Sequence, residues 1–378
     1  MEELKEKKRG PAAIFRLCPL RHVLVLLSGL VILFHVLTRK NYALNAALSD
    51  GFVRPVHKLL SRFTARLPFS VAEALIAAAV LGLLATVGVS AVRLFRRRAG
   101  WAQVYKVFVS LLAAGLCFYG SFCLLWGCYF YADDFIARSG LDAGEISVQE
   151  LETVTAYFAA LANEYAPLVS RDESGVCSSD RAAVLERSPE VYRRAEERFP
   201  VLAWPEIPAK GVFFSRIMSY LDFTGFFFPL TAEANVNTDF PPSLFASTVA
   251  HELAHLRGVA KEQEANFVAV LACLEYGDKD YVYSASLLAY THLGNALYKA
   301  DRGAWEEVYA TLSEPVLRDF AANRAYWQTF DTPVQTVSNT VYESFLYSYD
   351  QELGLKSYGA CVDLLVNYYY PQAAGLPG

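Results

Sequence analysis

Two histidines and a glutamate stand close together in the pentapeptide His-Glu-Leu-Ala-His at residues 251–255. Residues four apart on an α-helix lie on one face, about one turn from each other, so the imidazoles of His251 and His255 can bind the same Zn²⁺. Glu252 can reach water held at that metal and take its proton. The chain has only six histidines, which makes coincidence a poor explanation. We therefore expect a zinc site with His251 and His255 as ligands and Glu252 as general base.

A third protein ligand is needed, because a catalytic zinc is held by three side chains and keeps its fourth position for water. The acidic residues that follow the motif are Glu262, Glu264, Glu275 and Asp278. Gly258 is predicted to end the first helix, so the chain can fold back beneath the metal. Glu264 points roughly 200° around the next helix from Glu262, so only one of the two can face the metal.

We expect Glu262 to be this third ligand and keep Glu264 as the alternative. The competing interpretation is that both are solvated acids at the start of a helix. Asn266 stands four residues after Glu262 on the same helical face, from which it could orient the Glu262 carboxylate.

The segment HELAHLRGVAKEQEANFVAVLAC resembles the zincin metallopeptidases. Its Glu-x-x-Ala-Asn, from Glu262 to Asn266, is similar to the third-ligand motif of the Glu-zincin branch, although Glu262 follows His255 by only seven residues. The whole chain resembles more closely an uncharacterised bacterial family of membrane proteins in that superfamily. This resemblance implies a zincin-like domain that binds zinc and hydrolyses peptide bonds.

Hydrolysis of a peptide would also need a hydrogen-bond donor for the oxyanion. The candidates are Tyr283, His292, Tyr342 and Tyr358. Core packing competes with this role, because the chain contains 23 tyrosines. The stretch from Phe226 to Asn237 is expected to form short strands. They could provide the edge on which an extended substrate pairs, or they could be core strands.

Three apolar runs in the first third of the chain raise the apolar content to 54%. They lie at residues 22–37, 69–92 and 107–131, with lengths suited to crossing a hydrocarbon layer of about 30 Å as a helix, the first at the short limit. No small-residue cleavage site follows Leu37, which disfavours a signal peptide. We expect a membrane domain at residues 1–132 with three transmembrane helices.

The distribution of basic residues predicts the orientation of these helices, since cytoplasmic segments are rich in Lys and Arg. The basic residues before the first run and between the second and third are Lys5, Lys7, Lys8, Arg9, Arg16, Arg21, Arg93, Arg96, Arg97, Arg98 and Lys106. We expect these segments in the cytoplasm and the C-terminal domain outside it. The segment between the first two runs is also basic, so the prediction depends on the density of charge.

The remaining chain, residues 133–378, has a different composition. It holds 17 of the 34 Lys and Arg and 34 of the 39 Asp and Glu, which gives a net charge of about −17. An acidic domain does not suit nucleic acid, whose phosphates require a basic surface. We expect a mainly α-helical domain with a small β-sheet.

Together these features predict a multi-pass membrane protein with an extracytoplasmic zinc metallopeptidase domain that acts on a peptide or protein. The alternative is a catalytically silent zincin-like domain that serves as a sensor or binding module. A structural or transport-linked membrane protein is a third possibility, without a buried ion pair or broken helices to favour it. Cleavage inside the bilayer is disfavoured, because the helix that carries the histidines is too polar to insert. The sequence does not predict the oligomeric state.

Overall fold

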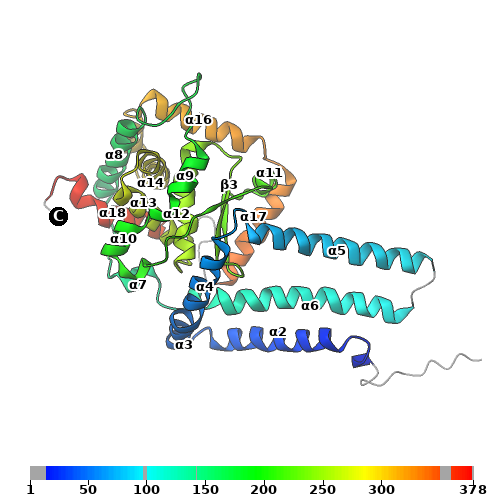
Figure 1. Ribbon diagram of the computed structural model, residues 1–378. Coiled ribbons are helices and arrows are strands. Elements are labelled where there is room, and N and C mark those ends of the chain that lie inside the picture. The colour runs from blue at the N-terminus through cyan, green and yellow to red at the C-terminus, as the bar shows by residue number, and fades with distance from the viewer. Residues whose placement is uncertain (1–13, 97–99, 142, 350–358, 377–378) are drawn as a thin grey trace, which may run out of the picture.

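Three long apolar helices extend side by side from one end of a globular body (Figure 1). The computed structural model describes residues 14–96, 100–141, 143–349 and 359–376. The three helices are α2 (Pro19–Thr38), α5 (Val71–Phe95) and α6 (Trp101–Leu125). All three are long and apolar enough to cross a membrane. The expected fold class, three N-terminal membrane helices followed by a mostly helical domain with a small sheet, is confirmed.

The end of the third apolar run differs from the prediction. Helix α6 stops at Leu125, and Gly127–Tyr131 form a 3₁₀ turn, η2, rather than more membrane helix. Trp126 and every residue of η2 are buried against the globular body. The apolar character of these residues therefore reflects contact with protein rather than with lipid, which composition alone does not distinguish.

The chain between the first two membrane helices packs on the globular body. It forms α3 (Tyr42–Leu48), the π-helical turn η1 (Ser49–Val53) and α4 (Arg54–Thr64). Arg54 donates hydrogen bonds to the carbonyl oxygens of Val201 at 2.7 Å, Ala203 at 3.0 Å and Arg257 at 3.1 Å. The sequence places this segment within the membrane domain, but α4 reaches residues after 132 through Arg54, and α3 packs on η2.

Most of the globular body is helical. Its α-helices are α7 (Phe135–Ser139), α8 (Val148–Tyr165), α9 (Arg181–Arg187), α10 (Arg193–Arg198), α11 (Ser215–Tyr220), α12 (Phe245–Leu256), α13 (Glu262–Tyr276), α14 (Lys279–Ala300), α15 (Arg302–Tyr309), α16 (Glu314–Gln328), α17 (Pro333–Ser348) and α18 (Gly359–Ala373). The 3₁₀ turns are η3 (Ser188–Glu190), η4 (Pro200–Leu202) and η5 (Pro242–Leu244). Helices α8, α12, α13, α14 and α18 meet in one apolar core. This core fixes α12, the helix that carries the histidine motif.

A three-stranded sheet lies beside α12. Its strands are β1 (Lys210–Val212), β2 (Gly225–Phe228) and β3 (Glu233–Asn237), in the order β1-β3-β2. Strand β3 runs parallel to β1 and antiparallel to β2, and all five of its residues are buried. Of the stretch expected to be either an edge or a core strand, β2 is therefore the edge and β3 the core.

The sheet is fastened to the start of membrane helix α5. Lys210 and Glu233 form a buried ion pair at 2.6 Å. The Glu233 carboxylate also accepts hydrogen bonds from the backbone N–H groups of Val71 at 3.1 Å and Ala72 at 2.8 Å. These groups belong to the first turn of α5, whose free N–H groups favour a negative charge. The sheet and the membrane helix are thus held in a fixed relation.

Candidate metal centre

The two histidines and the predicted third ligand come from helices α12 and α13, which are joined by a tight turn. Helix α12 ends at Leu256, as expected, and Gly258 has a φ of +89°, a conformation that favours glycine. Helix α13 begins at Glu262, because Lys261 before it has an extended backbone with φ −80° and ψ 127°. Glu262 is therefore the first residue of α13.

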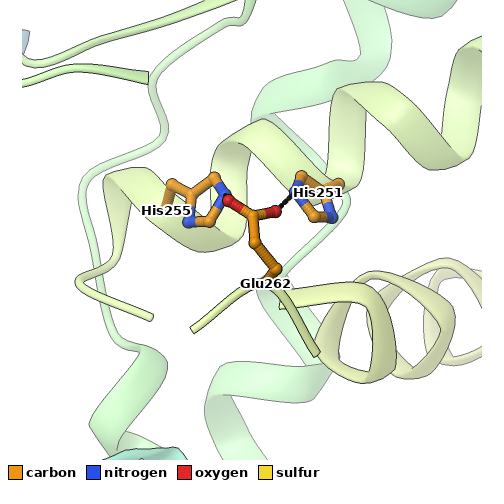
Figure 2. Close-up of side chains that lie close together, drawn as sticks. All are labelled: His251, His255 and Glu262. Carbon is orange, nitrogen blue, oxygen red and sulfur yellow. Dashed lines mark hydrogen bonds and ion pairs between the residues drawn. The ribbon is translucent and has the colours of Figure 1, made fainter. Parts of the chain in front are cut away.

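Figure 2 shows the Glu262 carboxylate between the two imidazoles. Glu262 Oε2 lies 3.1 Å from His251 Nε2, and Glu262 Oε1 lies 3.6 Å from His255 Nε2. One ligand-type atom from each of the three side chains lies within 4.8 Å of the other two. The structure thus brings together the three side chains that the sequence analysis selected as ligands.

The ring of His255 is oriented by the turn that follows α12. Its Nδ1 lies 2.7 Å from the carbonyl oxygen of Val259, to which it donates a hydrogen bond. This bond fixes the ring with Nε2 directed toward Glu262, and in the neutral imidazole that binds a metal Nε2 would carry the lone pair. Histidines that bind metals are usually oriented in this way.

Tyr342 of α17 contacts the Glu262 carboxylate from the other side. Its hydroxyl donates a hydrogen bond to Glu262 Oε1 at 2.8 Å. This tyrosine was one of four candidate donors in the sequence analysis. Its position shows that α17, some 80 residues further along the chain, closes one side of the cluster.

Glu252 is buried beside this cluster. Its Oε2 atom makes no hydrogen bond within the part of the chain that the structure describes. Burial raises the pKa of Glu252 to about 7. A buried carboxylate oxygen without a partner is unusual and indicates a polar group that acts on something other than the protein.

The glycine opposite Glu252 is required for this arrangement. A Cβ atom built on Gly225, the first residue of β2, would lie 2.5 Å from Glu252 Oε1. Any larger residue would push the carboxylate away. This role of Gly225 could not be predicted from the sequence, because the contact joins residues 27 positions apart.

The pKa values of His255 and Glu262 are shifted in opposite directions by their mutual interaction. Burial disfavours a charged His255, but the Glu262 carboxylate outweighs burial and raises the pKa of His255 to about 9. Burial likewise disfavours a charged Glu262, but the two imidazoles hold its pKa well below the usual range. A negative carboxylate opposite two imidazoles is an environment that a cation would suit.

The cluster opens into a cavity of about 450 Å³. Its walls come from strand β2 and the residues before it, from helices α12, α16 and α17, and from the end of membrane helix α6. Trp126, which follows α6, packs with its ring centroid 6.0 Å from that of His255 and 4.8 Å from that of Phe227. The candidate metal centre thus lies next to the end of a membrane helix.

One protein-family model matches most of the chain. The model of a family described as a protein of unknown function, DUF3810, matches residues 48–366. This chain belongs to the DUF3810 family. The match includes membrane helices α5 and α6 and the whole candidate metal centre. No curated protein and no solved structure matches the chain.

The other acidic candidates of this DUF3810 chain lie away from the cluster. Glu264 accepts hydrogen bonds from the backbone N–H groups of Phe135 at 2.9 Å and Ile136 at 3.4 Å, at the start of α7. Glu275 lies in the last turn of α13, and Asp278 caps α14. The structure therefore does not place Glu264, the alternative ligand, near the histidines. Asn266 lines the cavity, as its position four residues after Glu262 suggested.

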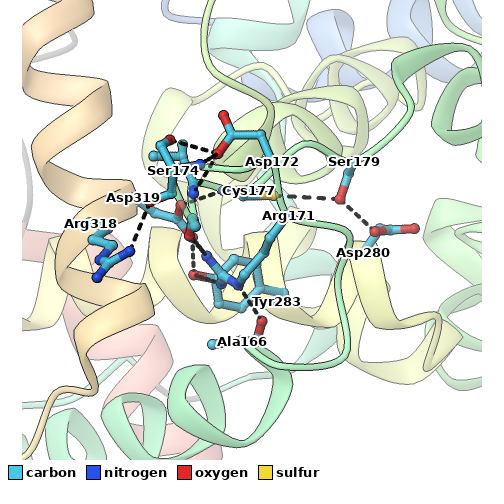
Figure 3. Close-up of polar contacts among 12 residues, drawn as sticks. Ala166, Arg171, Asp172, Ser174, Cys177, Ser179, Asp280, Tyr283, Arg318 and Asp319 are labelled. Atoms are coloured by element: carbon cyan, nitrogen blue, oxygen red, sulfur yellow. Dashed lines mark hydrogen bonds and ion pairs between the residues drawn. The ribbon is translucent and has the colours of Figure 1, made fainter.

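Two of the other candidate donors lie outside the cavity. The Tyr283 hydroxyl donates to Asp319 and accepts from Arg171 at 3.2 Å, in a polar cluster that holds the α8–α9 loop against α14 and α16 (Figure 3). His292 is buried in α14 and does not line the cavity. Tyr358 lies outside the described residues. Among the candidates that can be placed, Tyr342 donates a hydrogen bond to a member of the cluster, Glu262.

Proposed function

We propose that this chain is a membrane-anchored zinc metallopeptidase of the zincin type, in which His251, His255 and Glu262 hold the metal and Glu252 is the general base. The observation that carries the proposal is the position of all four side chains at one cavity, with both Nε2 atoms directed at the Glu262 carboxylate.

The set of donor atoms suits zinc. Two imidazole nitrogens and one carboxylate oxygen are a common set for catalytic zinc sites, which leave one coordination position open. The hydrogen bond from His255 to Val259 and that from Tyr342 to Glu262 orient two of the three ligands before any metal binds. When bound, Zn²⁺ lowers the pKa of water and polarises a carbonyl group.

The chain's own residues supply the proton transfer. Glu252 is adjacent to His251 and packed against Gly225, so its carboxylate has little freedom to move. A carboxylate with a pKa of about 7 can take a proton from water and return it to the leaving amine near neutral pH. Tyr342 positions Glu262 and lines the same cavity.

Strand β2 is suited to hold an extended peptide. Within the described residues β2 pairs with β3 along one edge and with no strand along the other, and Gly225, Phe226 and Phe227 line the cavity. An unpaired strand edge can accept a peptide by backbone hydrogen bonds, as many peptide-binding proteins do. A peptide bound there would pass beside Glu252.

The proposed orientation places the N-terminus in the cytoplasm and the globular body outside it. The helix ends that lie far from the globular body are the start of α2, the end of α5 and the start of α6 (Figure 1). Arg16, Arg21, Arg93, Arg96 and Lys106 belong to these ends or adjoin them in the sequence. The other basic residues of the predicted cytoplasmic segments, Lys5, Lys7, Lys8, Arg9, Arg97 and Arg98, lie outside the described residues.

Two basic residues at the opposite end, Arg54 and Lys58, contact other parts of the protein. Arg54 and Lys58 both lie over the ring of Trp204, at 5.3 Å from its centroid. Arg54 also bonds three backbone carbonyls, so these charges have a structural role that does not depend on the cytoplasm. These structural roles for two of the basic residues between the first two membrane helices support the proposed orientation.

Digestion of a peptide library by the full-length protein tests the proposal. The full chain is needed because residues 39–70 pack on the globular body. We expect cleavage by the zinc-loaded wild type. Glu252→Gln should keep its zinc and lose activity by about 10²–10⁴-fold, the usual contribution of a general base. Zinc binding without cleavage by the wild type would favour the silent sensor or binding domain instead, and unchanged cleavage by Glu252→Gln would refute the base assignment.

A further inference from the structure

Helix α17 presents an apolar stripe to the outside of the protein. Val334, Val337 and Val341 follow one another at intervals of three and four residues, which places them on one helical face. Their exposed fractions are 53%, 63% and 64%. A surface helix of a soluble domain normally carries polar residues on its outer face. We therefore expect the valine stripe to be covered by an apolar surface outside the described fold.

A second exposed apolar group lies where β1 leads into α11. Phe213 is 86% exposed, and Phe214 and Ile217 are also exposed. Two hydrogen bonds join α17 to the end of this segment, from Ser338 to the carbonyl of Leu221 at 2.8 Å and from Asn339 to Asp222 at 2.9 Å. The two groups thus belong to one part of the surface, which we call the apolar margin.

One end of the apolar margin is fixed to membrane helix α5. Glu73, in the first turn of α5, accepts hydrogen bonds from the backbone N–H groups of Phe213 at 3.0 Å and Phe214 at 2.6 Å. The two phenylalanines therefore stand where α5 enters the apolar layer.

The other end is fixed between membrane helices α2 and α6. Tyr349, which directly follows α17, is buried, and its ring lies 5.7 Å from that of Phe122 in α6. Its hydroxyl lies 3.4 Å from that of Tyr119. Arg39, just after α2, donates to the carbonyl of Ser348 at 3.3 Å. Helix α17 thus ends at the level of the last turns of α6.

We infer that the apolar margin lies in the surface of the lipid bilayer. Both of its ends are attached to helices that can span a membrane, and α11 and α17 lie at the side of the globular body from which those helices extend (Figure 1). Exposed aromatic and β-branched side chains suit the boundary between headgroups and acyl chains. The continuity with the membrane helices favours lipid over a second protein.

This position has a consequence for the substrate, which rests on the proposed function. Helix α17 also supplies Tyr342 and Phe345 to the wall of the catalytic cavity. The same two residues, with Phe223, line the groove beside the valine stripe. A cavity whose wall lies on the bilayer would take polypeptide at the membrane surface. The substrate class is then the segment of a membrane-anchored protein that adjoins the bilayer.

Spin labelling of the full-length protein in lipid nanodiscs tests the membrane contact without reference to catalysis. Nitroxide labels would be placed through Val337→Cys and Phe213→Cys, with Val148→Cys as control. Val148 is 44% exposed at the start of α8, away from the membrane helices. The unmodified protein, labelled in parallel, corrects for the seven native cysteines.

We expect the labels at Val337 and Phe213 to be several-fold more accessible to oxygen than to a water-soluble nickel chelate, and the control to show the reverse. Labels as accessible to the chelate as the control would overturn the inference. Labels protected from both reagents would also overturn it, since they would indicate a protein partner.

The substrate class needs a second measurement, cleavage of one peptide either free or attached to a lipid anchor in vesicles. We expect the wild type to prefer the anchored peptide, and Val337→Asp with Val341→Asp to reduce that preference without slowing cleavage of the free peptide. Equal cleavage of both forms by the wild type would refute the substrate class. Cleavage of neither form would refute the proposed function and leave the spin-label result intact.

Discussion

Glu262 is contacted from three sides, by His251, His255 and Tyr342. The helical spacing of the histidines and of Glu252 could be predicted from the sequence, because it depends only on the geometry of one helix. The choice between Glu262 and Glu264 could be argued from the sequence, but it depends on where α13 begins. Glu264 is held by the backbone of Phe135, more than 120 residues earlier. No local sequence pattern predicts that contact.

The contribution of Tyr342 can be measured at the same scale. Tyr342→Phe removes the hydrogen bond to Glu262 and keeps the ring, so we expect zinc affinity to fall by about 10–100-fold, the usual effect of losing a group that orients a metal ligand. Competition with a chromogenic chelator measures this affinity. The matched control is Tyr347→Phe, an exposed tyrosine on the same helix. Equal affinities for the two variants would show that Tyr342 does not act on the metal centre.

Several elements around the cavity were outside the reach of sequence patterns. The strands within residues 226–237 could be predicted to within about two residues, because glycine and proline bound short β-like stretches. The role of η2 could not, since its aromatic residues resemble the end of a membrane helix. The packing of α4 on the globular body also has no local signal. The packing of α4 depends on hydrogen bonds from Arg54 to carbonyl groups that are distant in the sequence.

The junction between the sheet and α5 gives a prediction at the scale of elements. Lys210→Met would leave the buried Glu233 carboxylate without its counter-charge, and breaking such a pair typically costs about 3–5 kcal/mol. We expect the Lys210→Met variant, purified in detergent, to unfold at a clearly lower temperature than the wild type when thermal unfolding is monitored by circular dichroism. Arg302→Met, which breaks the exposed pair with Glu306, should change the midpoint little. Similar midpoints for the two variants would mean that the buried pair does not stabilise the junction.

At the scale of the whole molecule, the fold places the candidate metal centre beside the end of a membrane helix. The three apolar helices could be predicted from composition alone, because lipid demands long apolar segments. Their packing against the walls of the cavity could not be predicted, because it depends on contacts between distant parts of the chain. Trp126, after α6, contacts His255, and Tyr349, after α17, contacts Phe122 of α6.

The proposed orientation can be tested in intact cells with a maleimide that does not cross membranes. Leu168→Cys, on the exposed surface of the globular body, should react from outside. Gly100→Cys, in the segment between α5 and α6, should react only after the cells are opened. The opposite pattern would show that the globular body faces the cytoplasm.

X-ray absorption at the zinc edge of the full-length protein tests the central claim most directly. We predict one zinc per chain with nitrogen and oxygen neighbours at about 2.0–2.2 Å and no sulfur neighbour. The zinc should be absent from His251→Ala and His255→Ala. Zinc that persists in those variants, or a sulfur neighbour at about 2.3 Å, would contradict the proposal that two histidines of α12 and Glu262 hold the metal.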